Sequence, residues 1–358
     1  MGLEADRLTP PMRLSIAVLA GDGVGPEVTA EAVRALEAVC GRYAHELDAR
    51  EGLIGGVAIH ETGGPLPADT LKLARSSHAI LLGAVGLPEF DTAPPDKRPE
   101  RGLLALRKEL NLYANLRPAR ILPGLEEFSP LKNERVVGTD LLIVRELAGG
   151  LYYGTPRVRE ADHAVNTMTY TRAEIERIAR LAFRFALGRR KKLTSVDKAN
   201  VLECSALWRS VVTEVGREYP EVELEHALVD SCAMQLVTQP RRFDVLLMEN
   251  MFGDILSDEA AVLAGSIGML ASASLGDGTS LYEPVHGSAP DIAGKGIVNP
   301  AGAIGSTAML LRHSFGLEQE AAHLELVLSE VLTSGIRTRD LGGKASTKEV
   351  GDAVVSAF

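Results

Sequence analysis

The chain has 358 residues, 46% hydrophobic and 24% charged, and a net charge of −10 at pH 7. This composition is typical of a globular protein with about two domains. The negative charge disfavours nucleic acid or an anionic membrane as a partner, and no apolar run approaches the roughly 20 residues of a membrane span. The three cysteines form no CxxC pair, which predicts free thiols in a reducing compartment, the cytoplasm.

Apolar runs and turn residues predict alternating strands and helices in the first part of the chain. A buried strand over residues 13–20 leads into the glycine loop GDGVGPEV and then a helix. A further strand is predicted over residues 78–85, and a helix with proline at its start over 99–110. Another strand is expected to end near Arg145.

The second part continues this alternation. Residues 171–192 predict a helix that begins with a capping box, Thr171 with Glu174, and ends in a basic run expected to be solvated. The segments KLTSVDKAN and RFDVLLMEN each predict a strand, and the second leads into a mostly apolar helix from Phe252 to Leu270. The pattern indicates a mixed α/β protein.

The glycine loop GDGVGPEV invites comparison with the dinucleotide fingerprint GxGxxG. Pro26 stands where the third glycine of that fingerprint would fall. The acids Glu46 and Asp48 lie near the distance at which a Rossmann fold places its ribose-binding acid, but their context is unconvincing. A tight turn from strand to helix is therefore the favoured interpretation.

Three acidic residues stand out because their surroundings are apolar. Asp254 and Asp258 lie four positions apart on one helix face, where like charges repel. Acids near a helix start are favoured by the macrodipole, which is one explanation; a bound divalent cation is the other. Asp230 is a lone acid in an apolar segment, and buried acids usually have a partner, of which a metal is one candidate.

Several further residues are candidates for substrate chemistry. Arg107, Arg117 and Arg145 could each grip a carboxylate with two parallel hydrogen bonds, or could be separate surface arginines. Lys198 ends a predicted strand, where catalytic groups often lie in α/β folds, and is either a general base or an exposed lysine. Tyr152 is either a proton donor or a packed loop residue.

The segment EPVHGSAPDIAGKGIVNP, residues 283–300, is rich in glycine, proline and small residues. Its main polar side chains are His286, Asp291 and Asn299. Backbone amides in such a loop can hold phosphates, and an aspartate can hold a ribose hydroxyl. As composition alone, this is a weak signal for a nucleotide site.

Together these segments resemble the β-decarboxylating dehydrogenases, the isocitrate/isopropylmalate dehydrogenase family, and within it the 3-isopropylmalate branch. The resemblance runs from about Leu14 to about Leu341, through GDGVGPEV, RPERGLLALRKELNLYANLRPA, VRELAGGLYYG, SVDKANVL, NMFGDILSDEAA and EPVHGSAPDIAGKGIVNP. It implies the family's two-domain α/β fold, not a Rossmann fold. Residues 1–112 and 265–358 would form a first domain with most of the NAD site, and residues 113–264 a second with the dimer interface and metal ligands.

The resemblance also implies a role for each candidate residue. Asp254 and Asp258, with Asp230 from the partner subunit of a homodimer, would bind Mg²⁺ or Mn²⁺. Lys198, which also crosses the interface, would be the catalytic base and Tyr152 the proton donor. The carboxylate clamp would be Arg107, Arg117 and Arg145, and Asp230 would contact the substrate as well as the metal. The NAD site would be His286, Gly287, Ser288, Ala289, Asp291, Ile292 and Asn299, with Asp291 and Ile292 favouring NAD over NADP.

Substrate choice is expected to depend on one face of the helix at residues 99–110. Glu100, Leu103 and Leu104 share that face, and the two leucines would bury a branched alkyl group, gaining about 0.8 kcal/mol per CH₂. They cannot hydrogen-bond the third carboxylate of isocitrate. The implied reaction is NAD-dependent oxidative decarboxylation of (2R,3S)-3-isopropylmalate to 4-methyl-2-oxopentanoate and CO₂, in leucine biosynthesis. Homoisocitrate, D-malate or another alkylmalate as substrate, and a non-catalytic nucleotide-binding subunit, are the alternatives.

Overall fold

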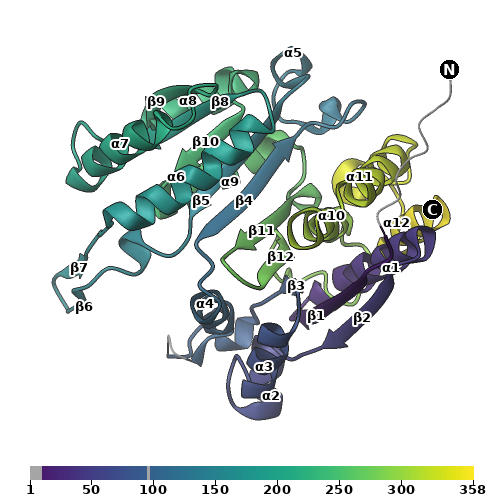
Figure 1. Ribbon diagram of the computed structural model, residues 1–358. Helices are drawn as coiled ribbons and strands as arrows, with labels where there is room; N and C mark the ends of the chain where they lie inside the picture. The colour runs from purple at the N-terminus through teal and green to yellow at the C-terminus, as the bar shows by residue number, and fades with distance from the viewer. Residues whose placement is uncertain (1–9, 95–96) are drawn as a thin grey trace. The chain divides into compact units, whose positions relative to one another are not determined.

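A computed structural model describes residues 10–94 and 97–358, in two compact units (Figure 1). The terminal unit consists of the chain up to Leu106 together with Gly278–Phe358, and the central unit is Arg107–Asp277. Residues 1–9, which the sequence assigns to the first domain, lie outside the described range. No helix in the described part of the chain is both long enough and apolar enough to span a bilayer.

The terminal unit is built on four parallel strands in the order β2-β1-β3-β12. The apolar strands β1 and β3 lie in the middle of this order and are buried, which explains their near-continuous hydrophobic sequences. Helices α1 and α10 pack against the strands, and α11 and α12 pack against these helices. The strands are β1 (Arg13–Gly21), β2 (Glu46–Glu51), β3 (Ala79–Ala84) and β12 (Ser280–Pro284). The helices are α1 (Gly25–Tyr43), α2 (Gly56–Thr62), α3 (Ala68–Ser76), α10 (Ala301–Phe315), α11 (Glu318–Thr333) and α12 (Thr347–Ser356).

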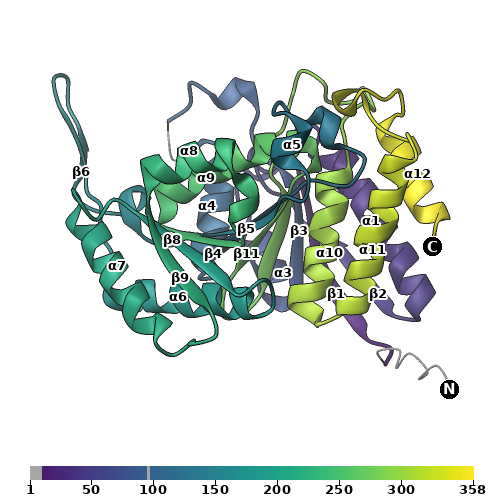
Figure 2. The same cartoon turned by 90° about the horizontal axis from the view of Figure 1, so that it is seen from above.

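The central unit contains six strands in the order β11-β4-β5-β10-β8-β9. Strand β4 is antiparallel to both neighbours, whereas β5, β10, β8 and β9 run parallel. Helices α6 and α7 pack on one face of these strands, and α8 and α9 on the other (Figure 2). The strands are β4 (Ala114–Arg120), β5 (Asp140–Glu146), β8 (Lys192–Asp197), β9 (Glu223–Leu228), β10 (Val245–Met248) and β11 (Ala271–Leu275). The helices are α5 (Asn133–Val136), α6 (Arg172–Leu187), α7 (Glu203–Gly216), α8 (Val229–Thr238) and α9 (Asn250–Leu263).

Two further elements do not belong to these layers. Helix α4 (Glu100–Glu109) crosses from the terminal unit into the central unit. Strands β6 (Arg157–Arg159) and β7 (Ala164–Asn166) pair antiparallel as an exposed hairpin, which Figure 2 shows extending away from the helices of the central unit.

The strands and helices predicted from the sequence are observed, but two details differ. Helix α9 ends at Leu263 rather than Leu270, because Gly265 adopts a left-handed conformation with φ of 86°. The capping box of α6 is confirmed, but the basic run after it is not simply solvated. Arg189 Nε donates to the carboxylate of the buried Asp244 at 2.8 Å, so this arginine neutralises an internal acid.

The parallel strands of the central unit bring their carboxyl ends to one edge. Met248 on β10 pairs with Arg145 on β5 and with Val196 on β8. Lys198 follows directly after β8, and helices α8 and α9 begin directly after β9 and β10. This edge therefore collects the side chains of the candidate site, as expected for an open α/β sheet.

Candidate active site

Asp254 is hydrogen-bonded to two other predicted site residues, Arg145 and Tyr152. Arg145, at the end of β5, places its Nη1 2.5 Å from Asp254 Oδ1. Tyr152 donates its hydroxyl to the other carboxylate oxygen of Asp254 at 2.8 Å. The Arg145 side chain is only 6% exposed, and burial lowers its pKa while Asp254 opposes that shift. The carboxylate of Asp254 thus compensates a buried guanidinium and orients a phenol.

Asn250 connects this group to the loop before Tyr152. Its Oδ1 accepts from Arg145 Nε at 3.2 Å and Nη2 at 2.8 Å. Its Nδ2 donates to the carbonyl of Gly149 at 3.1 Å. The amide is buried and all three bonds are made inside the protein. Asn250 was not predicted as a site residue, although its place at the start of a helix that follows a strand was a usable signal.

Two buried glutamates hold the backbone around the site, and the sequence analysis missed both. Glu249 caps α9 by accepting two backbone N–H groups of its first turn, at 2.8 and 3.1 Å. Glu146 accepts two backbone N–H groups of the loop after β5, at 2.8 and 2.9 Å, and burial raises its pKa to about 7. Tyr170 donates to Glu249 at 3.2 Å and accepts from the backbone N–H of Asn250 at 3.0 Å.

Gly253 is the helix residue over which Arg145 lies. A Cβ at this position would fall 2.3 Å from Cγ and 2.7 Å from Cβ of Arg145. These atoms belong to the inner stem of the arginine and cannot move away without moving the guanidinium. The glycine in the segment NMFGDIL is therefore required by the path of Arg145 across α9.

Asp258, one helical turn further along α9, faces a second arginine. Arg117 on β4 places its Nη1 2.5 Å from Asp258 Oδ1 and 2.8 Å from Ser257 Oγ. Its Nε donates to Asn115 Oδ1 at 3.0 Å. Each acid of the predicted metal pair is thus opposed by one arginine of the predicted carboxylate clamp, which offsets the repulsion between the two acids.

Lys198 and Asp230 form a separate pair at the same edge of the strands. Lys198 Nζ donates to Asp230 Oδ1 at 2.8 Å, and this hydrogen bond lowers the pKa of Asp230. Within the part of the chain that the structure describes, Asp230, Asp254 and Asp258 do not form a group whose carboxylate oxygens all lie within 4.8 Å of one another. Within one chain, the three predicted metal ligands therefore do not form one compact cluster.

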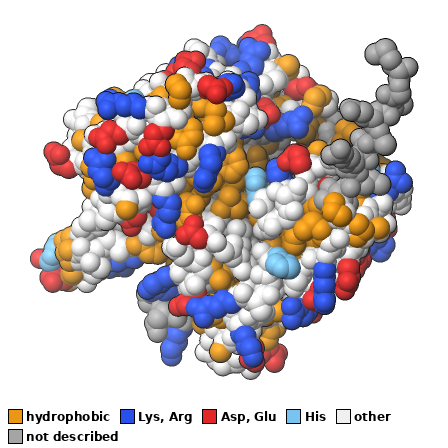
Figure 3. Space-filling view, viewed as in Figure 1, with side chains coloured by type: hydrophobic (Ala, Val, Ile, Leu, Met, Phe, Trp, Pro, Cys, Tyr) orange, Lys and Arg blue, Asp and Glu red, His pale blue; other side chains and the backbone are white. Residues whose placement is uncertain are grey.

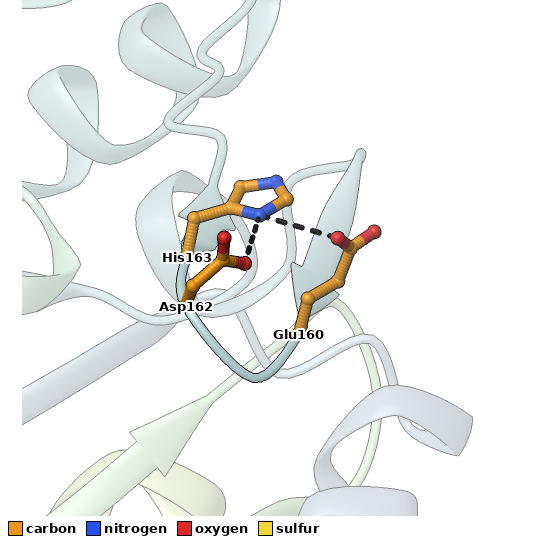
Figure 4. Close-up of side chains that lie close together, drawn as sticks. All are labelled: Glu160, Asp162 and His163. Atoms are coloured by element: carbon orange, nitrogen blue, oxygen red, sulfur yellow. Dashed lines mark ion pairs between the residues drawn. The ribbon is translucent and has the colours of Figure 1, made fainter.

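A different cluster does meet that distance criterion, at the tip of the β6–β7 hairpin (Figure 4). His163 Nδ1 lies 3.3 Å from a carboxylate oxygen of Glu160 and 3.6 Å from one of Asp162. All three residues are exposed. Polar contacts across a solvated turn account for this arrangement, and none of the three was a predicted site residue.

Helix α4 carries the residues expected to select the substrate. Gly102 and Leu106 are buried on one side of the helix. Leu104 is exposed and Leu103 half-buried, and Glu100 on the same face is exposed. Two branched apolar side chains on this face are thus at least partly exposed. Arg107 lies in the last turn of this helix and is half-buried.

The predicted nucleotide loop lies in the terminal unit. His286 is buried, and burial lowers its pKa. Its Nδ1 lies 2.9 Å from the carbonyl of Gly287, while its Nε2 is buried and has no hydrogen-bond partner among the described residues. Asn299 accepts a backbone N–H at 3.0 Å and donates to Asp340 at 2.9 Å. Asp291 is exposed and Ile292 half-buried.

The loop GDGVGPEV is a tight turn, as the sequence analysis favoured. A Cβ on Gly21 or Gly23 would meet the carbonyl oxygen of Ala84 or Ser288 at 2.0 Å. Protein backbone therefore fills the space that a Rossmann loop leaves for pyrophosphate. Asp48 lies near the start of β2 and pairs with Arg13 at 3.1 Å, so it is not placed as a ribose-binding acid.

One hollow on the described surface is lined by none of the predicted site residues. This hollow of about 520 Å³ is lined by Glu134, Arg135, Thr238, Gln239, Arg241 and Arg242. On the face shown in Figure 3, acidic and basic side chains are interspersed.

Comparison with known proteins identifies the family. The profile described as isocitrate/isopropylmalate dehydrogenase matches residues 15–354. A protein of Aquifex aeolicus (strain VF5) named 3-isopropylmalate dehydrogenase is 56% identical over 351 residues, which are 96% of this chain and 96% of the relative. The protein of the same name from Bacillus subtilis (strain 168) is 54% identical over 358 residues, covering 96% and 98% of the two chains.

Solved structures agree with this assignment. The crystal structure of isocitrate dehydrogenase from Methylococcus capsulatus has a TM-score of 0.85 and 37% identity, over 96% of this chain and 98% of that one. A β-decarboxylating dehydrogenase from Thermococcus kodakarensis, in its apo form, has a TM-score of 0.81 and 41% identity, over 96% and 95% of the two chains. The predicted fold class is confirmed, and the chain belongs to the isocitrate/isopropylmalate dehydrogenase family.

Proposed function

We propose that this protein oxidises and decarboxylates 3-isopropylmalate with NAD⁺, giving 4-methyl-2-oxopentanoate and CO₂ for leucine biosynthesis. The observation that carries the proposal is the convergence of Arg145 and Tyr152 on Asp254. A carboxylate-binding cation, a proton donor and an oxygen ligand for a metal are the groups that oxidative decarboxylation of a hydroxy diacid requires. The relatives named 3-isopropylmalate dehydrogenase support the choice of substrate.

Asp254 and Asp258 fit a divalent cation such as Mg²⁺ or Mn²⁺. Hard cations prefer carboxylate oxygens, and these two acids lie one helical turn apart with side chains 37% and 64% exposed. We assign the third ligand to Asp230 of the partner subunit. The dinucleotide would occupy the loop around His286, whose buried and unpartnered Nε2 offers a polar contact to an adenine base. In this assignment the terminal unit carries most of the NAD site, and the central unit carries the metal ligands.

The chain's own residues then have defined tasks. Arg107, Arg117 and Arg145 bind the two substrate carboxylates, and Leu103 and Leu104 contact the isopropyl group. NAD⁺ supplies the hydride acceptor, and the cation supplies charge compensation for the hydroxyl oxygen. Nζ of Lys198 of the partner subunit takes the hydroxyl proton as the hydride leaves the same carbon.

Decarboxylation is completed by Tyr152. The bond between the carboxylate and the neighbouring carbon breaks, and its electron pair remains with that carbon framework as an enolate while CO₂ leaves. Tyr152 then returns one proton to carbon, which balances the proton removed by Lys198. Burial is the main cause that raises the pKa of Tyr152, and the hydrogen bond to Asp254 is the second. The phenol therefore carries its proton at neutral pH.

A homodimer would complete the site, and the surface of the central unit supports one. Helices α8 and α9 pack together and expose Met234 (64%), Ile255 (60%) and Val262 (56%). A second copy that covered these two helices would remove the three apolar side chains from water. Asp230 and Asp258 lie exposed on the same two helices, so a second copy covering this surface would bring its acids and lysine to the edge of the site.

The free cysteines support a reducing compartment, and we propose the cytoplasm. Cys40, Cys204 and Cys232 are all free thiols. Burial raises the pKa of Cys40 to about 11 and that of Cys232 to about 12, so neither is a reactive thiolate.

A substrate panel tests the proposed reaction. Purified protein with Mg²⁺ or Mn²⁺ and NAD⁺ is assayed for NADH formation with 3-isopropylmalate, isocitrate, homoisocitrate and D-malate. We expect kcat/KM for 3-isopropylmalate to exceed each of the others by at least about tenfold, because the leucines favour an alkyl group over a carboxylate. An equal or larger value for isocitrate would refute the substrate assignment. Binding of NAD⁺ without reduction, under all of these conditions, would instead favour a regulatory subunit.

A further inference from the structure

The segment GDGVGPEV is the strongest motif of the sequence to which the proposed reaction gives no task. In the structure it contacts the predicted nucleotide loop directly. The backbone N–H of Val24 donates to the carbonyl of Ser288 at 2.8 Å. Gly23 lies against the same carbonyl so closely that a Cβ would fall 2.0 Å from its oxygen. The turn therefore supports the start of the nucleotide loop.

The next contact is made by Glu27, in the first turn of α1. Its Oε1 accepts from the backbone N–H of Gly294 at 2.5 Å, and its Oε2 accepts from that of Gly296 at 3.0 Å. Both glycines have positive φ, 74° and 62°. One half-buried carboxylate thus holds the N–H groups of two glycines in left-handed conformations, and hydrogen bonds to a charged group are the stronger kind.

Asp291 and Ile292 lie between these two anchors. Inside the loop, the backbone N–H of Ile292 donates to Ala289 at 3.1 Å, and that of Lys295 donates to Ile292 at 3.2 Å. The loop is therefore a compact turn held at Ser288 by Val24 and at its far end by Glu27. Fixing both ends before a ligand arrives lowers the ordering cost of binding.

We propose that Glu27 is a positioning residue for cofactor binding: its carboxylate fixes the turn at residues 289–296 in the conformation that receives the adenosine half of NAD⁺. This inference rests on the proposed function, because it takes the loop around Asp291 to be the cofactor site. In this proposal, GDGVGPEV holds the backbone of the nucleotide loop in place and does not itself contact the phosphates of NAD⁺.

Glu27→Gln tests the proposal, since glutamine keeps one acceptor oxygen and puts a donor in place of the other. We expect the Kd for NAD⁺, measured by calorimetry on the purified protein, to rise about tenfold, the loss of one charge-assisted hydrogen bond. At saturating NAD⁺, kcat should stay within about twofold. Asp69→Asn is the matched control, because it removes an acid from the first turn of α3 in the same unit and should leave the Kd unchanged.

Hydrogen exchange on the cofactor-free protein gives a second readout. Glu27→Gln should speed exchange of the Gly294 and Gly296 amides while leaving α1 and α10 protected as in the wild type. An unchanged Kd for NAD⁺ in Glu27→Gln, with or without a loss of stability, would overturn the proposal. If Glu27→Gln does not fold, Glu27→Asp is measured instead. If neither variant folds, Glu27 is required for folding, and the proposal is overturned in that case too. Failure of the wild type to bind NAD⁺ would count against the proposed function instead.

Discussion

Arg145 and Asp254 lie 2.5 Å apart, although 109 positions separate them in the sequence. Arg145 ends a buried strand, and Asp254 lies in the second turn of the helix that follows the neighbouring strand. The second oxygen of Asp254 accepts the Tyr152 hydroxyl at 2.8 Å. The carboxylate therefore fixes the positions of Arg145 and Tyr152 relative to each other. If these are the substrate-binding cation and the proton donor, as proposed, substitutions of neighbouring residues should change the kinetic constants.

Gly253→Ala should displace Arg145, because the new methyl group would fall 2.3 Å from Cγ of the arginine. We expect KM for 3-isopropylmalate to rise at least about tenfold, and stability to fall by about 1–3 kcal/mol, as overpacking of a filled interior usually costs. Steady-state kinetics and urea unfolding would measure both. Gly41→Ala is the control: it lies in α1, and an added Cβ there meets nothing within 4 Å. This control should be neutral or stabilised by about 0.4–1 kcal/mol.

Tyr152→Phe removes the phenol that is proposed to protonate carbon. We expect kcat to fall about 10²–10⁴-fold, the usual contribution of a general acid, with KM changed only a few-fold. Rapid-quench analysis should show that the first hydride transfer persists while protonated product forms slowly. Tyr153→Phe is the neighbouring control and should retain near-normal turnover. Equal rates for Tyr152→Phe and the wild type would remove Tyr152 from the reaction.

Lys198→Met removes the proposed base and the partner of Asp230. NADH formation should fall by at least about 10²-fold, while Mn²⁺ binding, measured by calorimetry, should change little because the proposed metal-binding carboxylates remain. Lys191→Met is the control, because it changes an exposed lysine just before the same strand. It should leave the rate of NADH formation unchanged. Substantial NADH production by Lys198→Met would mean that another group takes the hydroxyl proton.

Glu146 predicts a pH dependence of stability. Burial raises its pKa from the ordinary glutamate value of 4.5 to about 7 in the folded protein. At pH values between these two pKa values, the folded state therefore holds a proton that the unfolded state has released. The stability contributed by the protonated acid is fully present below the unfolded pKa, and about 3 kcal/mol of it is lost as pH rises to about 7.

Glu146→Gln should flatten this dependence, since the amide does not titrate. Urea unfolding at a series of pH values between 5 and 8, on both proteins, measures the difference. The difference in unfolding free energy between the two proteins should shift in favour of the variant as pH rises from 5 to about 7, and level off above that. A constant difference would show that the Glu146 carboxyl has the same pKa in the folded and unfolded states.

Local pattern in the sequence was enough for the strands, the helices and the residues at strand ends. The positions of Lys198 and Arg145 at strand ends could be predicted because each lies at the end of a buried apolar run. The long motifs were enough to predict the family. The contacts that organise the site were not recognisable. Glu27 reaches Gly294 across 267 positions, and Asn250 reaches Arg145 across 105. Spacing along the chain contains no information on such pairings, which depend on strand order and on the path of each side chain.

Helix ends were the least predictable local feature. The apolar pattern after Leu263 continues for several residues, but Gly265 terminates α9 through its left-handed conformation. A Cβ at this glycine would also fall 2.7 Å from Cβ of Phe128. The end of the helix is therefore decided partly by packing against a distant loop, which hydrophobic periodicity does not report.

Mixed dimers test most directly the central claim that each active site draws Lys198 and Asp230 from one subunit and Asp254 and Asp258 from the other. Lys198→Met and Asp254→Asn chains, each inactive alone and carrying different affinity tags, are co-expressed and the heterodimer isolated. Our account predicts recovered activity, because one of the two sites then contains no substitution. The matched heterodimer of Lys198→Met with Asp230→Asn should stay inactive, since both residues come from the same side of each site. Absence of activity in the first heterodimer, or recovery in the second, would contradict the shared site.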